Sequence, residues 1–179
     1  MRVSVVVTLP DMKTVPPPLC ERTHPDDLRL APASSALRRG RVSLPGQIYL
    51  ITTRTSLGEP VFADFCNARL TIRVLQTYSP AAATLAYVLM PDHLHWLIQL
   101  HNRLSLSQVV AAVKARSAYL INQRGVRRGA VWLSGFHDHA VRREEDLASI
   151  ARYIVLNPVR SGLVKSWRDY PHWDAIWLP

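Results

Sequence analysis

The sequence predicts an α+β fold in which one antiparallel sheet carries helices packed mainly on one face. Three observations lead to this prediction. Periodic segments follow one another in the order strand, helix, strand, strand, helix, strand, helix. Two of the strands are joined by a short Pro-Asp turn, which requires them to be antiparallel. Hydrophobic residues make up 48% of the 179 residues, enough to bury the core of one domain.

The first half of the chain supplies three predicted strands and one helix. Residues 47–53 are β-branched and aromatic and lie between Pro45-Gly46 and Gly58, which predicts a strand. Apolar residues recur at helical spacing over 62–78. Residues 84–90 form a second predicted strand, and the turn at Pro91-Asp92 returns the chain into a third over 93–100.

The second half supplies two helices and an edge strand. A helix is predicted over 105–124, with Ser105 and Gln108 as a capping box and Gly125 as its stop. A fourth strand is predicted around 130–141. A final helix over 143–156 ends before Pro158, because the residue preceding a proline is disfavoured in the α region.

The charge is distributed unevenly along the chain. Lys and Arg number 22 and Asp and Glu 13, which gives a net charge of +9. Residues 1–36 have balanced charge, six prolines and no glycine, and we expect an extended or disordered leader there, followed by a single domain over 37–179. No apolar run approaches the roughly 18 residues of a membrane span. The two cysteines, Cys20 and Cys66, fit neither a disulfide framework nor a metal quartet, so a cytoplasmic protein is expected.

Two histidines occupy alternate positions in the third predicted strand. His93 and His95 share one face, while Leu94 and Trp96 point to the other, which is the core face. The two imidazoles are about 7 Å apart along the backbone, so their nitrogens can converge on one metal ion. Asp92 is close enough to assist. The same pattern also fits a solvated strand face that happens to carry two histidines.

The last predicted helix places Tyr153 and Asn157 together on the flank of its apolar stripe. A phenol held there can act as a nucleophile on phosphorus, and an amide oxygen suits a hard divalent ion such as Mg²⁺ or Mn²⁺. Tyr153 also fits a role as a packed boundary residue, and Asn157 a role as a helix cap. Tyr119 and Gln123 repeat the same spacing on the preceding helix, and spacing alone does not separate the two tyrosines.

Two runs of the sequence resemble the signature blocks of REP-associated tyrosine transposases, which are bacterial members of the single-tyrosine HUH transposase superfamily. The runs are 90–97 (Met-Pro-Asp-His-Leu-His-Trp-Leu) and 152–164 (Arg-Tyr-Ile-Val-Leu-Asn-Pro-Val-Arg-Ser-Gly-Leu-Val). Further similarity extends over most of 37–175 and includes the block 170–173 (Tyr-Pro-His-Trp). Leu133 departs from the family pattern, where a glutamine is expected after Trp132.

The resemblance implies a ferredoxin-like HUH-type sandwich and a role for each matching residue. His93 and His95 would be the metal ligands, Asn157 the third ligand and Tyr153 the nucleophile, which leaves Tyr119 as the alternative. Such proteins cut single-stranded DNA beside hairpins of palindromic repeats through a 5′-phosphotyrosine. The implied function is a metal-dependent endonuclease and strand transferase acting at REP hairpins.

A basic surface would hold the DNA. The expected DNA-binding residues are Arg38, Arg39, Arg41, Lys114, Arg116, Arg127, Arg128, Arg142 and Arg152. His137 and His139 are expected to line the DNA cleft as auxiliary groups. The alternative function is a non-catalytic binder of structured DNA or RNA that keeps the same fold and charge. The expected partner is hairpin-containing single-stranded DNA, without a membrane, and the protein would be a monomer or homodimer associated with the bacterial nucleoid when bound to DNA.

Overall fold

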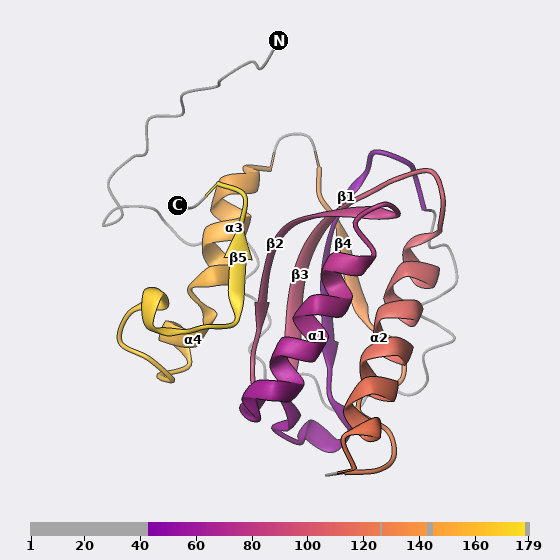
Figure 1. The fold of residues 1–179 in the computed structure, drawn as a ribbon. Coiled ribbons are helices and arrows are strands. Elements are labelled where there is room, and N and C mark those ends of the chain that lie inside the picture. The colour runs from indigo at the N-terminus through magenta and orange to yellow at the C-terminus, as the bar shows by residue number, and fades with distance from the viewer. Residues whose placement is uncertain (1–42, 126, 143–144, 178–179) are drawn as a thin grey trace. The chain divides into compact units, whose positions relative to one another are not determined.

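A computed structural model describes residues 43–125, 127–142 and 145–177, and these form a five-stranded sheet with helices on both faces (Figure 1). The strand order is β4-β1-β3-β2-β5, and every neighbouring pair is antiparallel. The strands are β1 (Ile48–Arg54), β2 (Ala82–Leu89), β3 (His93–Leu100), β4 (His137–Ala140) and β5 (Trp173–Ala175). The predicted α+β class with one antiparallel sheet is confirmed. The predicted leader, residues 1–36, lies outside the described residues.

The central strands follow the sequence prediction closely. The bounds of β3 are those predicted, and the Pro91-Asp92 turn joins it to β2 as an antiparallel hairpin. The turn is held by a bond from the Met90 backbone N–H to the carbonyl oxygen of His93 (2.8 Å). The pairing of β1 with β3 sets Thr52 opposite His95 and Arg54 opposite His93, which decides the surroundings of the histidine pair.

Helices α1 (Phe65–Thr77) and α2 (Leu106–Gln123) cover one face of the sheet, where the larger core lies. The predicted helix over 62–78 begins later than expected, because the Asp64 carboxylate accepts a bond from the Asn67 N–H and caps the first turn. The capping box of Ser105 and Gln108 is present in α2. The chain leaves α2 at Gly125, whose φ of +74° requires a residue without a side chain.

The opposite face carries a shorter helix, α3 (Leu147–Val155), which packs against β2, β3 and β5. Its start is four residues later than predicted, because Asp146 is the N-cap and accepts a bond from the Ala148 N–H (3.0 Å). Together α3 and the strand residues of this face form a second core, which includes Leu97 and Val88. Two helices on one face and one on the other agree with the predicted packing.

Three features of the second half differ from the prediction or were not predicted. The strand predicted around 130–141 shortens to β4, and its first part forms an isolated bridge between Trp132 and Thr55, the residue that follows β1. Helix α4 (Asn157–Arg160) follows α3 directly, and β5 closes the edge beside β2. None of the helices in the described part of the chain is long and apolar enough to cross a bilayer.

Candidate active site

The two predicted metal ligands lie side by side on the sheet face that carries α3. The rings of His93 and His95 meet edge to face, with centroids 4.9 Å apart, and both side chains are half-buried. They share this face with Leu97, which packs into the second core beneath α3. The side chains of Leu94 and Trp96 are buried on the opposite face, as predicted.

Each imidazole is oriented by a neighbour that engages its Nδ1 atom. His93 Nδ1 lies 2.6 Å from the Asp92 carboxylate, and His95 Nδ1 lies 3.0 Å from the Thr52 hydroxyl. Among the described residues, neither Nε2 atom has a hydrogen-bond partner in the protein. An Nδ1–H that donates to an oxygen leaves Nε2 with its lone pair, which is the form in which histidine binds metals.

The electrostatics favour a neutral His95. Burial, together with the nearby positive charge of His93 and Arg54, lowers the pKa of His95 to about 3. The pKa of Asp92 is held below its usual value, chiefly by its hydrogen bond with His93. A carboxylate that accepts a bond from a ligating imidazole is a frequent outer partner of metal sites. Asp92 is therefore placed to orient His93.

The donor set fits a divalent ion that needs further oxygen ligands. In the described residues no three side chains among His, Cys, Asp and Glu converge on one position, so the histidine pair would need an oxygen from another residue type. Asn157 is the residue that the sequence analysis expects to supply one. Its amide nitrogen donates to the carbonyl oxygens of Tyr153 and Ile154, both at 3.0 Å, and so caps α3. Oδ1 has no protein partner among the described residues, so capping and ligation are compatible.

Tyr153 lies on α3 and therefore on the same side of the sheet as the histidines. Its ring is half-buried and packs against the second core, in which Ala151 and Ile154 are buried. The outer side of the ring is covered by the guanidinium of Arg160, whose central carbon is 4.5 Å from the ring centroid. Tyr153 is thus held between an apolar core and a cation.

The structure separates the two candidate tyrosines. Tyr119 lies on α2, which covers the face opposite the histidines, and it is 54% exposed on the outer surface of that helix. The guanidinium of Arg116 lies 5.6 Å from the centroid of its ring. The sheet stands between Tyr119 and the histidine pair of the same chain, so the repeated Tyr-x-x-x-amide spacing does not create a second equivalent site.

The auxiliary histidines share the face of the metal-ligand pair. The pairing of β4 with β1 sets His137 beside Thr52 and His139 beside Leu50, so both point to the histidine side, and both are exposed. His139 Nε2 lies 3.0 Å from the carboxylate oxygens of Glu145, in the segment that leads into α3. These placements are compatible with the predicted role of lining a DNA cleft.

Two of the predicted DNA contacts have other partners. The Lys114 ammonium donates to the carbonyl oxygens of Leu133 (2.6 Å) and Gly135 (2.5 Å), and burial lowers its pKa to about 8. Arg127 pairs with Glu59 at 2.5 Å. Both side chains therefore have partners within the protein, and their predicted role in binding phosphate stays a prediction.

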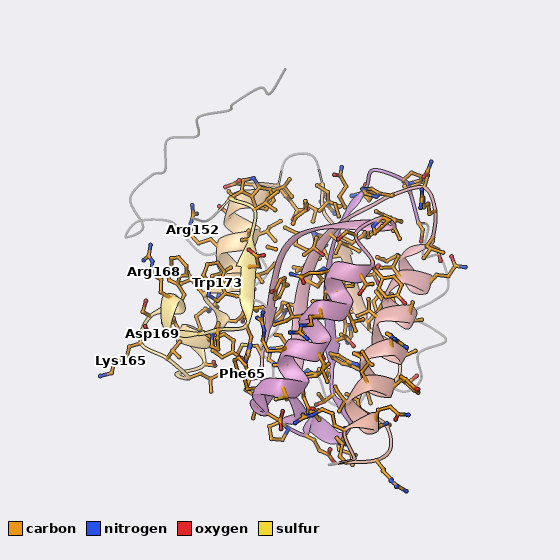
Figure 2. The ribbon with its side chains drawn as sticks, viewed as in Figure 1. Phe65, Arg152, Lys165, Arg168, Asp169 and Trp173 are labelled. Atoms are coloured by element: carbon orange, nitrogen blue, oxygen red, sulfur yellow. The ribbon has the colours of Figure 1, made fainter. Side chains whose placement is uncertain are left out.

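The other predicted contacts have more open positions. Arg116, Arg128 and Arg142 are exposed and Arg152 is half-exposed, while Arg38, Arg39 and Arg41 lie outside the described residues. Figure 2 shows Arg152 together with Lys165 and Arg168 on the part of the molecule formed by α3, α4 and β5, away from α1 and α2.

Sequence reasoning missed Thr52, Arg54 and Tyr170. Thr52 and Arg54 border the histidines only because of the register between β1 and β3, which the sequence does not encode locally. The hydroxyl of Tyr170 donates to the carbonyl oxygen of Leu89 (2.7 Å), at the end of β2 just before the histidine turn. The alternation of Thr52 and Arg54 along β1 was the one signal that could have identified these two residues; no local pattern pointed to Tyr170.

Comparisons with known proteins agree with this arrangement. A curated Haemophilus influenzae protein with the name "Putative REP-associated tyrosine transposase" is 30% identical over 99 residues, which is 50% of this chain and 56% of that protein. The chain thus matches little more than half the length of this relative. A solved structure described as a REP-associated tyrosine transposase bound to a REP hairpin has the same fold. Its TM-score is 0.61 at 22% identity, over 74% of this chain and 79% of the other.

The family model described as "Transposase IS200 like" matches residues 68–157. This range is half of the chain and includes both histidines, Tyr153 and Asn157. This chain therefore belongs to the IS200-like transposase family.

Proposed function

We propose that the protein is a metal-dependent endonuclease and strand transferase that acts on single-stranded DNA beside REP-type hairpins. The observation that carries the proposal is that α3, with Tyr153, packs on the sheet face that presents His93 and His95. The hairpin substrate is supported by the similar solved structure, which is described as bound to a REP hairpin. The net charge of +9 supports a polyanionic partner.

The metal would be held by His93, His95 and the amide oxygen of Asn157. When bound, Mg²⁺ or Mn²⁺ would supply Lewis-acid polarisation of a non-bridging oxygen of the scissile phosphate. The chain's own contribution is to prepare the ligands: Asp92 and Thr52 fix the two imidazoles, and the low pKa of His95 keeps its Nε2 lone pair available.

Tyr153 would carry out the covalent step. Its phenolic oxygen forms a bond to phosphorus while the bond from phosphorus to the 3′-oxygen breaks. The phenol releases its proton and the departing 3′-oxygen takes one up, so the products are a 5′-phosphotyrosine and a 3′-hydroxyl. One phosphoester bond replaces another, so attack by a 3′-hydroxyl on the phosphotyrosine can rejoin strands without an external energy source.

The test uses single-stranded oligonucleotides that contain a hairpin flanked by randomised sequence. One pool is labelled at the 3′ end and a second pool at the 5′ end, and each is incubated with the full-length protein and Mn²⁺. Only the downstream fragment becomes attached to protein, so a labelled band that survives SDS and heat is expected from the 3′-labelled pool. The 5′-labelled pool should give free fragments that end in a 3′-hydroxyl. The opposite labelling pattern would contradict a 5′-phosphotyrosine.

Matched variants assign the residues. Tyr153→Phe should abolish the adduct and leave hairpin affinity unchanged, whereas Tyr119→Phe should leave the adduct intact. His93→Ala and His95→Ala should each lose the adduct together with its Mn²⁺ response. If wild-type protein binds hairpins but gives no adduct under any of these conditions, the protein is a non-catalytic binder.

A further inference from the structure

Arg160 makes a specific contact with the proposed nucleophile. Its guanidinium carbon lies 4.5 Å from the centroid of the Tyr153 ring, within the range of a cation–π contact. The pair spans seven positions and joins two helices, α3 and α4. Neither the metal ligands nor the expected DNA contacts include Arg160.

The backbone between the two residues is fixed by hydrogen bonds. Asn157 caps α3 through its amide and also begins α4. Pro158 is buried at the start of α4, where its locked φ suits a first helical turn. The Arg160 N–H donates to the carbonyl oxygen of Leu156 (3.0 Å). The connection is thus short and braced, and it returns residue 160 beside the ring of Tyr153.

This arrangement limits the motion of the phenol. One part of the Tyr153 ring packs on the second core, and the planar guanidinium covers another. A nucleophile must hold its oxygen in line with the bond that breaks. A displacement of the reacting atom by about 1 Å, even when a mutation far from the chemistry causes it, can cost about 100-fold in rate. A flat cation suits this role better than a flexible ammonium, because it stacks over the ring face.

We propose that Arg160 is a positioning residue for Tyr153, which stacks on its ring and fixes the direction of its hydroxyl for attack on phosphorus. The inference rests on the proposed role of Tyr153 as nucleophile. It predicts that Arg160 affects the rate of adduct formation from bound DNA and leaves the affinity for DNA unchanged.

The experiment measures these two quantities separately on the full-length protein. Single-turnover adduct formation is followed at saturating hairpin DNA, and the dissociation constant is measured without metal. In Arg160→Ala the rate should fall about three- to tenfold, the loss expected for one cation–π contact, and the dissociation constant should stay within about twofold. Arg160→Lys keeps the charge without the planar group, so its rate should stay close to that of Arg160→Ala.

Arg168 provides a matched control. Its guanidinium carbon lies 4.2 Å from the centroid of the Trp167 ring, in the same part of the molecule. Arg168→Ala therefore removes the same charge and the same kind of stacking without touching Tyr153, and its rate should equal that of the wild type. An equal loss of rate in Arg168→Ala would show that general charge matters, and would overturn the proposal.

A second measurement does not depend on activity. In protein labelled with ¹³C on the tyrosine rings, the Tyr153 signal is assigned by its loss in Tyr153→Phe, and its ring flips should be faster in Arg160→Ala. Unchanged ring dynamics would contradict positioning even if no adduct forms. If Arg160→Ala binds DNA more weakly but forms the adduct at the normal rate at saturation, or if Arg160→Lys restores the wild-type rate in full, Arg160 contacts phosphate and the proposal is overturned. If the wild-type protein forms no adduct but the ring of Tyr153 flips faster in Arg160→Ala, only the proposed function is rejected.

Discussion

Thr52→Val should weaken metal binding with little effect on folding. The substitution keeps the shape of the side chain and removes the hydroxyl that lies 3.0 Å from His95 Nδ1. Removing the outer partner of a ligating histidine typically costs 10- to 100-fold in metal affinity, or about 1.4 to 2.7 kcal/mol. The free energy of unfolding should fall by only about 1 kcal/mol, because one hydrogen bond is lost and valine suits a strand.

The neighbouring threonine supplies the control. Thr53 points to the opposite face, is 3% exposed, and its hydroxyl has no hydrogen-bond partner in the described structure. Thr53→Val should therefore raise the free energy of unfolding by about 1 kcal/mol and leave metal affinity unchanged. Calorimetric titration with Mn²⁺ and urea denaturation measure the two quantities. Wild-type Mn²⁺ affinity in Thr52→Val, or an equal loss in Thr53→Val, would refute the assignment of His95 as an oriented ligand.

Three further predictions concern stability and DNA binding. The free energy of unfolding should decline as the pH falls from 6.5 toward about 3, by up to about 1.4 kcal/mol per pH unit. The cause is that the imidazole of the unfolded chain takes up a proton that buried His95 does not. Urea denaturation across this pH range should show a shallower decline in His95→Asn. Lys114→Met should lower the free energy of unfolding by about 1 to 3 kcal/mol, since it loses two hydrogen bonds to backbone carbonyls. The salt dependence of hairpin binding should stay unchanged. A weaker salt dependence in the variant would show that Lys114 contacts phosphate. Tyr170→Phe should lower the free energy of unfolding by about 1 to 2 kcal/mol through loss of the bond to Leu89, and an unchanged denaturation midpoint would contradict this.

Local patterns predicted most of the fold. The alternation of His93 to Leu100 gave the exact bounds of β3, because one face is core and the other is not. The capping box at Ser105 likewise located the start of α2 to within one residue. The start of α1 was predicted too early, because Asp64 caps the helix three residues into the predicted range. Strand β4 was predicted too long, because the chain at Trp132 pairs through an isolated bridge to Thr55, which is distant in sequence. The three-residue β5 has too little pattern to predict and exists through its pairing with β2.

The candidate site was only partly predictable, for a similar reason. Candidates that rest on residue type and spacing, such as the histidine pair, could be proposed from the sequence. Spacing alone did not separate Tyr153 from Tyr119; the resemblance favoured Tyr153, and the structure places the helix of Tyr153 on the face of the histidines. The partners Thr52 and Arg160 required a strand register and a helix connection, respectively. The expectation for Lys114 rested on its charge, and the neighbouring carbonyl groups that use this charge became visible only in three dimensions.

The two faces of the sheet are expected to tolerate mutation differently over evolutionary time. Beneath α1 and α2 the side chains are enclosed, Trp96 among them, so most changes there should reduce the amount of folded protein. On the other face α3 covers β2, β3 and β5, while exposed His137 and His139 occupy the β4 edge. Surface positions along this edge can vary with little penalty to folding. If this edge contacts DNA as proposed, changes there would alter the choice of nucleic-acid target while the core beneath α1 and α2 is kept.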